Sequence, residues 1–138
     1  MRRVVCASER YLRIHGVPQV PNDIRQHSCV RHLGLTPRSE WQFRVGNRRV
    51  SIPIASIVTC NEIDSAINAC MDGLGLGMFL SYMVAQNRKA GQLKYVLEKF
   101  EIEPLPVQIV YPTSKLLSTK VCAFIDECTE KLRHVPLE

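Results

Sequence analysis

The chain has 138 residues, 46% of them hydrophobic and 22% charged, which is typical of one globular domain with a sizeable core. No apolar run approaches the roughly 20 residues of a membrane span, and no secretory signal is present, so the sequence predicts a cytoplasmic protein without a membrane partner. The net charge of +5 is modest, and no basic stripe with interleaved aromatic residues favours direct binding of nucleic acid.

The first third of the chain predicts two short strands separated by helical turns. Arg3 to Ala7 is an apolar run typical of a buried strand, and Ser8 can cap a short helix over Glu9 to His15. One or two further helical turns are expected over Asn22 to Gln26, followed by a strand over Ser28 to Leu33.

A β-hairpin is expected over Glu40 to Ile54, where apolar and polar residues alternate on both sides of a two-residue link, Gly46-Asn47. Trp41 and Phe43 fall on one face of this alternation. Cross-strand packing is the commoner role for such a pair, and a surface for a partner protein is the alternative.

The segment from Ile57 to Ser81 predicts a strand, a helix and a second strand. Asn61 is the expected N-cap of an amphipathic helix whose uncovered N-terminus offers backbone N–H groups to a ligand. Gly73, Gly75 and Gly77 are expected to end the helix before a strand over Met78 to Leu80. This order is wrong for a dinucleotide-binding glycine motif, which follows a strand and opens a helix.

The last third predicts a helix over Tyr82 to Lys89, strands over Leu93 to Leu97 and Val107 to Tyr111, and a final helix from Ser118. The apolar face of the final helix consists of Val121, Phe124, Ile125, Cys128 and Leu132. Strands alternating with helices, together with the hairpin, predict an α/β sandwich with a mixed sheet.

Metal, cofactor and catalytic chemistry find no support in the residue spacing. The six cysteines contain no Cys-x-x-Cys pair and lie in apolar runs, which favours free core thiols for at least four of them; a redox pair of Cys60 and Cys70 is the alternative. The four histidines are scattered, and no serine has a nearby base. We therefore expect no cofactor, no metal and no enzymatic activity.

Small polar residues follow several of the predicted strands, where ligands bind in open α/β sheets. The candidate ligand-binding residues are Ser8, Thr59, Cys60, Asn61 and Ser81. Each also has a purely structural interpretation, as a helix cap or the end of a strand. Glu62 and Asp64 suit the start of the helix electrostatically but would repel an anionic ligand there.

Ordered motifs over the whole chain resemble LysR-type transcriptional regulators, and the first of them resembles the opening of the family's second effector-binding subdomain. They are Val4-Val5-Cys6-Ala7-Ser8 with Tyr11-Leu12 and Gly16, Trp41-x-Phe43, Asn61 with its helix, Gly73 to Gly77, Gln92-Leu93, Leu105-Pro106-Val107 with Tyr111-Pro112, and Lys120 to Asp126. The resemblance implies a fold like type II periplasmic binding proteins, with a small-molecule effector between two subdomains. Members usually have proline where this chain has Ser81.

The resemblance also implies a division of the chain. Residues 1–111 correspond to the second effector-binding subdomain with its hinge strands, and residues 112–138 to a C-terminal helix of the first subdomain. The winged helix-turn-helix, linker helix and first subdomain of the family precede this region, so a truncated chain that reaches DNA only through an absent domain is expected. Without its partner surface, the final helix predicts a homodimer or a swapped oligomer.

The sequence therefore predicts an effector-binding, regulatory fragment of a LysR-type regulator. The alternative is a stand-alone small-molecule-binding or interaction domain that has no DNA-binding partner domain.

Overall fold

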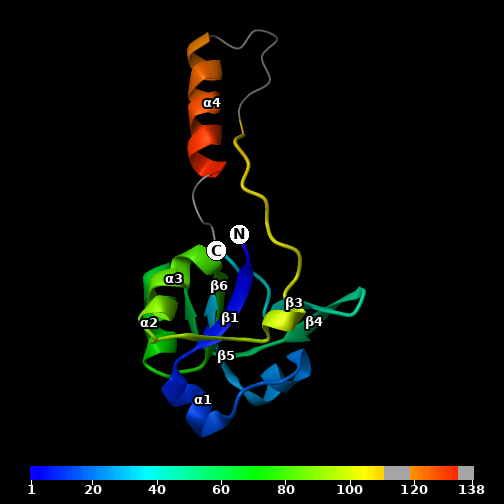
Figure 1. Ribbon diagram of the computed structural model, residues 1–138. Coiled ribbons are helices and arrows are strands. Elements are labelled where there is room, and N and C mark those ends of the chain that lie inside the picture. The colour runs from blue at the N-terminus through cyan, green and yellow to red at the C-terminus, as the bar shows by residue number, and fades with distance from the viewer. Residues whose placement is uncertain (111–118, 134–138) are drawn as a thin grey trace.

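The computed structural model describes residues 1–110 and 119–133 (Figure 1). The described elements are, in chain order, β1 (Arg3–Ala7), α1 (Glu9–His15), the 3-10 helix η1 (Pro21–Gln26), β2 (Ser28–His32), β3 (Glu40–Val45), β4 (Arg48–Pro53), β5 (Ala55–Cys60), α2 (Ile63–Met71), β6 (Leu76–Leu80), α3 (Ser81–Lys89), β7 (Lys94–Val96), the 3-10 helix η2 (Glu98–Phe100) and α4 (Thr119–Arg133).

Five strands form one mixed sheet in the order β5-β2-β6-β1-β7. β2 runs parallel to both β5 and β6, whereas β1 runs antiparallel to β6 and β7. The hairpin β3–β4 is a separate two-stranded sheet, and Val45 pairs with Arg48 across the Gly46-Asn47 turn. The predicted α/β fold with a mixed sheet is confirmed.

The sheet separates two hydrophobic cores, because alternate residues of each strand point to opposite faces. Val4 and Cys6 of β1 pack with α2 and α3, whereas Val5 and Ala7 pack with the hairpin. Trp41 and Phe43 of the hairpin are both buried in this second core, so they pack across the layers as expected. Figure 1 shows α2 and α3 on one side of the sheet and the hairpin on the other.

Three glycines follow α2, Gly73, Gly75 and Gly77, and they have different structural roles. Gly73 has a φ of 82° just after the helix, in the left-handed region that favours glycine. A Cβ at Gly75 would collide with the backbone carbonyl of Ser28, so only glycine lets β6 approach β2 at this point. Gly77 lies within β6 and does not end the helix.

The prediction that Asn61 caps α2 is wrong. Glu62 occupies the N-cap position, and its side chain makes no capping hydrogen bond. The carbonyl oxygen of Asn61 instead accepts a hydrogen bond from His32 Nε2 at 2.9 Å. A contact from the neighbouring strand, which sequence periodicity does not encode, thus moves the start of the helix by one residue.

The predicted strand over Val107 to Tyr111 is also wrong for its described residues, 107–110. These residues form no strand, and the side chain of Val110 is 89% exposed. A β-branched run becomes a strand only where a sheet edge offers hydrogen bonds, and this segment leads away from the sheet (Figure 1). Tyr111 lies outside the described residues.

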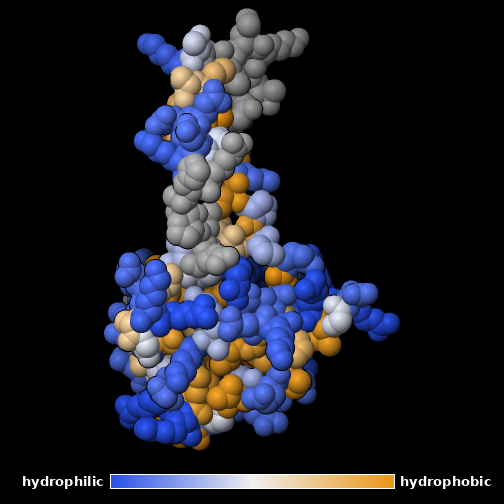
Figure 2. Space-filling model, in the orientation of Figure 1, coloured by the Kyte–Doolittle hydropathy of each residue, from blue (hydrophilic) through white to orange (hydrophobic). Residues whose placement is uncertain are grey.

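The final helix is confirmed as α4, although Ser118, its expected first residue, lies outside the described residues. α4 stands apart from the sheet in Figure 1, and Phe124 is 66% exposed. Figure 2 shows hydrophobic side chains on the surface of α4 and of the extended segment before it. No helix within residues 1–110 and 119–133 is long and apolar enough to cross a membrane.

Candidate functional site

The carboxyl ends of β2, β5 and β6 lie at one edge of the sheet, because these three strands are parallel. The start of β1 lies at the same edge, where Arg3 pairs with Leu80. We call this the carboxyl edge. The extended segment after η2 leaves the body there, and α4 lies beyond it (Figure 1).

Thr59, Cys60 and Asn61 lie together at the carboxyl edge, where β5 ends. Thr59 and Asn61 are exposed, and Cys60 is half-buried against the core under α2. Thr59 pairs with Arg31 in the parallel register of β5 and β2, so both side chains lie on the hairpin side of the sheet. The structure thus places these three candidate residues at one end of β5, with Thr59 and Cys60 on opposite faces of the sheet.

The imidazole of His32 makes two hydrogen bonds beside the end of β5. Its Nε2 donates to the carbonyl of Asn61, and its Nδ1 accepts the backbone N–H of Leu35 at 3.2 Å. One ring therefore connects the start of α2 to the loop between β2 and β3. A Cβ at Gly34 would lie 2.8 Å from the His32 ring, so glycine leaves room for this bridge.

Ser8 is not part of this cluster. β1 runs antiparallel to β6, so its carboxyl end lies at the opposite edge of the sheet. The Ser8 side chain is buried and accepts the backbone N–H of Tyr11 at 3.3 Å as the N-cap of α1. The contacts of Ser8 are therefore those of a helix N-cap. The sequence pattern grouped Ser8 with the other candidates because it does not show the direction of β1 relative to β6.

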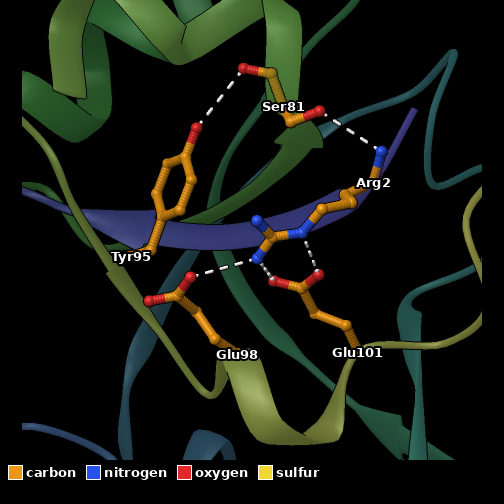
Figure 3. Close-up of polar contacts among 5 residues, drawn as sticks. All are labelled: Arg2, Ser81, Tyr95, Glu98 and Glu101. Atoms are coloured by element: carbon orange, nitrogen blue, oxygen red, sulfur yellow. Dashed lines mark hydrogen bonds and ion pairs between the residues drawn. The ribbon is translucent and has the colours of Figure 1, made fainter. Parts of the chain in front are cut away.

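Ser81 lies at the carboxyl edge but points into the protein. Its hydroxyl accepts the backbone N–H of Arg2 at 3.2 Å (Figure 3). Its own N–H donates to the Arg2 carbonyl at 2.9 Å. The hydroxyl of Tyr95 donates to the Ser81 carbonyl at 3.3 Å. Ser81 is fully buried and ties the start of β1 to α3.

A charged clamp joins the two chain segments that lead to the carboxyl edge. The guanidinium of Arg2 makes a bidentate contact with Glu101, at 2.7 and 2.8 Å, and a further bond to Glu98 at 3.0 Å (Figure 3). Met1 and Leu105 exchange backbone hydrogen bonds at 2.8 and 2.9 Å beside it. Bidentate arginine–carboxylate pairs fix geometry as well as charge, so this clamp holds the segments side by side.

A cavity of about 250 Å³ opens between the start of β1, the end of β6 and the loop before β3. Arg3, Thr36, Trp41 and Met78 are among its lining residues. Within the described residues, the Nε of Arg3 and the indole Nε1 of Trp41 are buried without a hydrogen-bond partner. Each such group costs about 1–3 kcal/mol of folding free energy, so two of them around one cavity need an explanation.

Sequence reasoning missed this cavity, although one signal was present. Arg3 is a charged residue that shares a face of β1 with Val5 and Ala7, whose side chains lie in the core under the hairpin. A charged side chain on the core-facing side of a strand is rare unless it has a partner or a function. Trp41 gave no such signal, because an inward tryptophan normally serves packing alone.

Metal and redox chemistry receive no support from the described residues. They contain no group of three or more histidine, cysteine or acidic side chains placed to hold a metal ion. Cys60 and Cys70 are both free thiols, and burial raises the pKa of Cys70. Three cysteines are fully buried, Cys6, Cys29 and Cys70, which is fewer than the four expected, although half-buried Cys60 also packs against the core.

The fold is that of the regulatory domains of LysR-type regulators, which resemble type II periplasmic binding proteins. It aligns with the regulatory domain of AphB from Vibrio vulnificus with a TM-score of 0.77 and 21% identity, covering 94% of this chain and 64% of that one. It also aligns with the CrgA regulatory domain from Neisseria meningitidis with a TM-score of 0.70 and 22% identity, covering 95% and 64%.

The chain belongs to the LysR substrate binding domain family, whose model matches residues 1–133. The members are domains of transcriptional regulators and are not enzymes. The chain is 29% identical to the HTH-type transcriptional regulator YcaN of Escherichia coli over 139 residues, 96% of this chain and 45% of the relative. It is 33% identical to YhjC of the same organism over 125 residues, 88% and 42%. The chain thus spans less than half the length of these relatives.

Proposed function

We propose that the chain is the effector-binding part of a cytoplasmic LysR-type regulator and supplies one wall of a cleft between two subdomains. The observation that carries this proposal is the convergence at the carboxyl edge. Exposed polar residues, a cavity and the clamped segments all lie at the edge from which the chain leaves toward α4.

Thr59, Cys60 and Asn61 are the ligand contacts that we propose from the original candidates. Their hydroxyl, thiol and amide groups lie at the end of β5, and Thr59 and Asn61 are exposed. Ser8 lies at the opposite edge, and the Ser81 hydroxyl holds the backbone of Arg2, so neither belongs to the proposed contact surface.

In an intact regulator, an effector in the cleft would act by population shift. It stabilises whichever arrangement of the two subdomains it contacts more completely, and it changes DNA binding only by that difference in affinity. The clamp formed by Arg2, Glu98 and Glu101 supports this proposal, because it makes the connection between the halves stiff on one side. DNA itself would be contacted by a domain outside this chain.

We further propose that residues 1–111 form the second subdomain with its hinge, and that the helix within residues 112–138 packs on the first subdomain. Where that surface is missing, the exposed side of α4, including Phe124, packs against a second copy in a homodimer or swapped oligomer. Light scattering tests this directly, and a monodisperse monomer would contradict it.

The remaining candidate is a stand-alone small-molecule-binding or interaction domain. The genomic sequence upstream of the Met1 codon distinguishes the two. A helix-turn-helix encoded in frame supports the regulator, and a promoter with a stop codon supports the stand-alone domain.

Ligand binding is tested by recording backbone amide spectra of the isotope-labelled chain against a panel of small polar metabolites. We expect weak binding, because one wall of the cleft is missing, with shifts confined to the carboxyl edge around Thr59 and Asn61. Tight binding in calorimetry, or shifts centred on Ser8 at the opposite edge, would contradict the proposed cleft.

A further inference from the structure

Two neighbouring hollows meet at Phe100. One has a volume of about 280 Å³ and lies between η1 and the hairpin, and the other, of about 430 Å³, lies between the loop before η1 and the segment of β7 and η2. Phe100 lines both of them, so they form one groove, which we call the Phe100 groove. Its lining consists of residues 17–22, residues 95–100, Val45, Val50 and Ile52. None of these residues lines the cavity of Arg3 and Trp41.

Apolar side chains of the Phe100 groove reach solvent. Val20 and Val45 line its first hollow and are 46% and 44% exposed, and Val17, which lines the second, is 51% exposed. Figure 2 shows hydrophobic side chains gathered on the front of the body between α1 and the hairpin. A single exposed apolar side chain is ordinary, but several around one groove mark an interaction surface.

Three exposed cations border the Phe100 groove. Arg48 pairs with Val45 across the hairpin turn, so the two side chains project from the same face. Lys99 lines the second hollow. Arg25 lies three positions after Asn22 in η1, and positions three apart eclipse in a 3-10 helix. Within residues 1–110 and 119–133, none of these three cations forms an ion pair.

Two carboxylates next to the groove are already engaged within the chain. Asp23 accepts the backbone N–H groups of Gln19 and Val20 at 2.8 and 3.0 Å, and so shapes the loop that forms one wall. Glu98 accepts a hydrogen bond from Arg2 at 3.0 Å (Figure 3). The border of the groove therefore keeps an excess of positive charge, which favours a partner that carries acidic groups.

We propose that the Phe100 groove binds an acidic, amphipathic segment of another protein, whose apolar side chains lie on both sides of Phe100 and whose carboxylates pair with Arg25, Arg48 and Lys99. An open groove with two hollows suits a chain segment with several anchoring side chains. A second copy of this chain is a poorer match, because it would bring a net charge of +5 to the same cations. This inference goes beyond the proposed function and does not depend on it.

A synthetic peptide of about 15 residues, with leucine on one helical face and glutamate on the other, is a suitable probe. One control peptide has glutamine in place of every glutamate, and a second has serine in place of every leucine. Fluorescence anisotropy of the labelled peptides gives the dissociation constants. We expect saturable binding of the acidic peptide, and binding at least about ten-fold weaker for each control. Binding should also weaken as salt is raised from about 0.05 to about 0.5 M.

Variants of the chain place the peptide in the groove. Val45→Asp and Arg48→Glu should each weaken binding of the acidic peptide about ten-fold or more, because the first removes an apolar contact and both add a repelling charge. Ile57→Asp and Arg38→Glu make the same changes at exposed positions outside the groove, and should bind within about two-fold of the parent. Urea denaturation shows whether each variant is folded, and Arg48→Glu provides the test if Val45→Asp is not.

The inference is overturned if the glutamine or the serine peptide binds as tightly as the acidic peptide. It is also overturned if Val45→Asp binds like Ile57→Asp, or Arg48→Glu like Arg38→Glu. A lower mass of Val45→Asp than of the parent chain in light scattering would overturn it as well, since a second copy would then occupy the groove.

Discussion

We compare the body of the chain, residues 1–100, with the C-terminal part, which consists of the extended segment and α4. Both regions have amphipathic hydrophobic patterns, but the apolar side chains are buried in the body and exposed in α4. In the body, Phe79 is 1% exposed between β1 and α2. In α4, Phe124 has the same chemistry at an equally regular position and is 66% exposed. The amphipathic pattern therefore predicts which face of a helix or strand needs to be buried, but it does not predict which other part of the protein buries it.

The two regions also differ in what holds them. The body is stabilised by two hydrophobic cores, one on each face of the five-stranded sheet. The segment after η2 is held at its start by Arg2, through Glu98 and Glu101, and by the exchange between Met1 and Leu105. Specific polar contacts thus fix the chain at the carboxyl edge, where hydrophobic burial ends.

The largest difference in stability is expected when one phenylalanine of each region is replaced by alanine. Phe79→Ala should lower the free energy of unfolding by about 3–5 kcal/mol, because it opens a cavity in the core under α2 and α3. Phe124→Ala should change it by less than about 0.5 kcal/mol. Urea denaturation measures both, and equal losses would remove the distinction between the regions.

Self-association should depend on α4 alone. Phe124→Glu should convert the proposed dimer to a monomer, because burying a carboxylate in an apolar contact is strongly unfavourable. Ile14→Glu on α1 is the matched control, since Ile14 is 64% exposed, and it should leave the dimer intact. Multi-angle light scattering gives the mass of each variant. A dimer that survives Phe124→Glu would place the interface elsewhere.

The clamp at the boundary should have an intermediate effect. Arg2→Met should reduce the free energy of unfolding by about 1–2 kcal/mol, because it leaves Glu101, which is mostly buried, without its cation. It should also speed hydrogen exchange at the Leu105 amide, which donates to Met1. Arg38→Gln, at an exposed ion pair, is the control with little expected effect. Unchanged exchange at Leu105 in Arg2→Met would show that the clamp does not fix this segment.

The smallest effect is a dependence on pH within the body. Burial lowers the pKa of His27 below its ordinary value of 6.5, with nearby His15 acting in the same direction and Asp23 opposing it. The folded chain therefore resists a proton that the unfolded chain accepts, so stability is complete above about pH 6.5 and falls as the pH drops toward the lowered pKa.

Comparing unfolding at about pH 7.5 and about pH 5.5 tests this dependence. His27→Gln should lose less stability between the two than the parent chain, although it also changes a contact with the Tyr11 hydroxyl at 3.2 Å. The same loss in both proteins would exclude His27 as the titrating group.

The sequence predicted most elements because local rules decided them. The Gly46-Asn47 link fixed the register of the hairpin, and Ser8 caps α1 as its residue type suggests. The predictions failed where a distant contact decided. His32 of β2 holds the Asn61 carbonyl and shifts the start of α2, and Val107 to Val110 found no sheet edge to join.

The candidate site shows the same division. Sequence reasoning placed Thr59, Cys60 and Asn61 at a strand end, and the structure groups them there. It could not separate Ser8 from them, because no local rule gives the direction of β1 relative to β6. It also missed the cavity of Arg3 and Trp41, since a pair brought together from β1 and β3 leaves no periodic pattern.

By itself, the sequence determined the family, the α/β class and the order of helices and strands, because these depend on local propensities and on motifs in linear order. The tertiary structure decided which strand ends share an edge, which polar groups converge around a cavity and which apolar face stays uncovered. The physical reason is that strand direction, register and burial are set by contacts between residues far apart in the chain. The carboxyl edge, and any site on it, exists only after those contacts have formed.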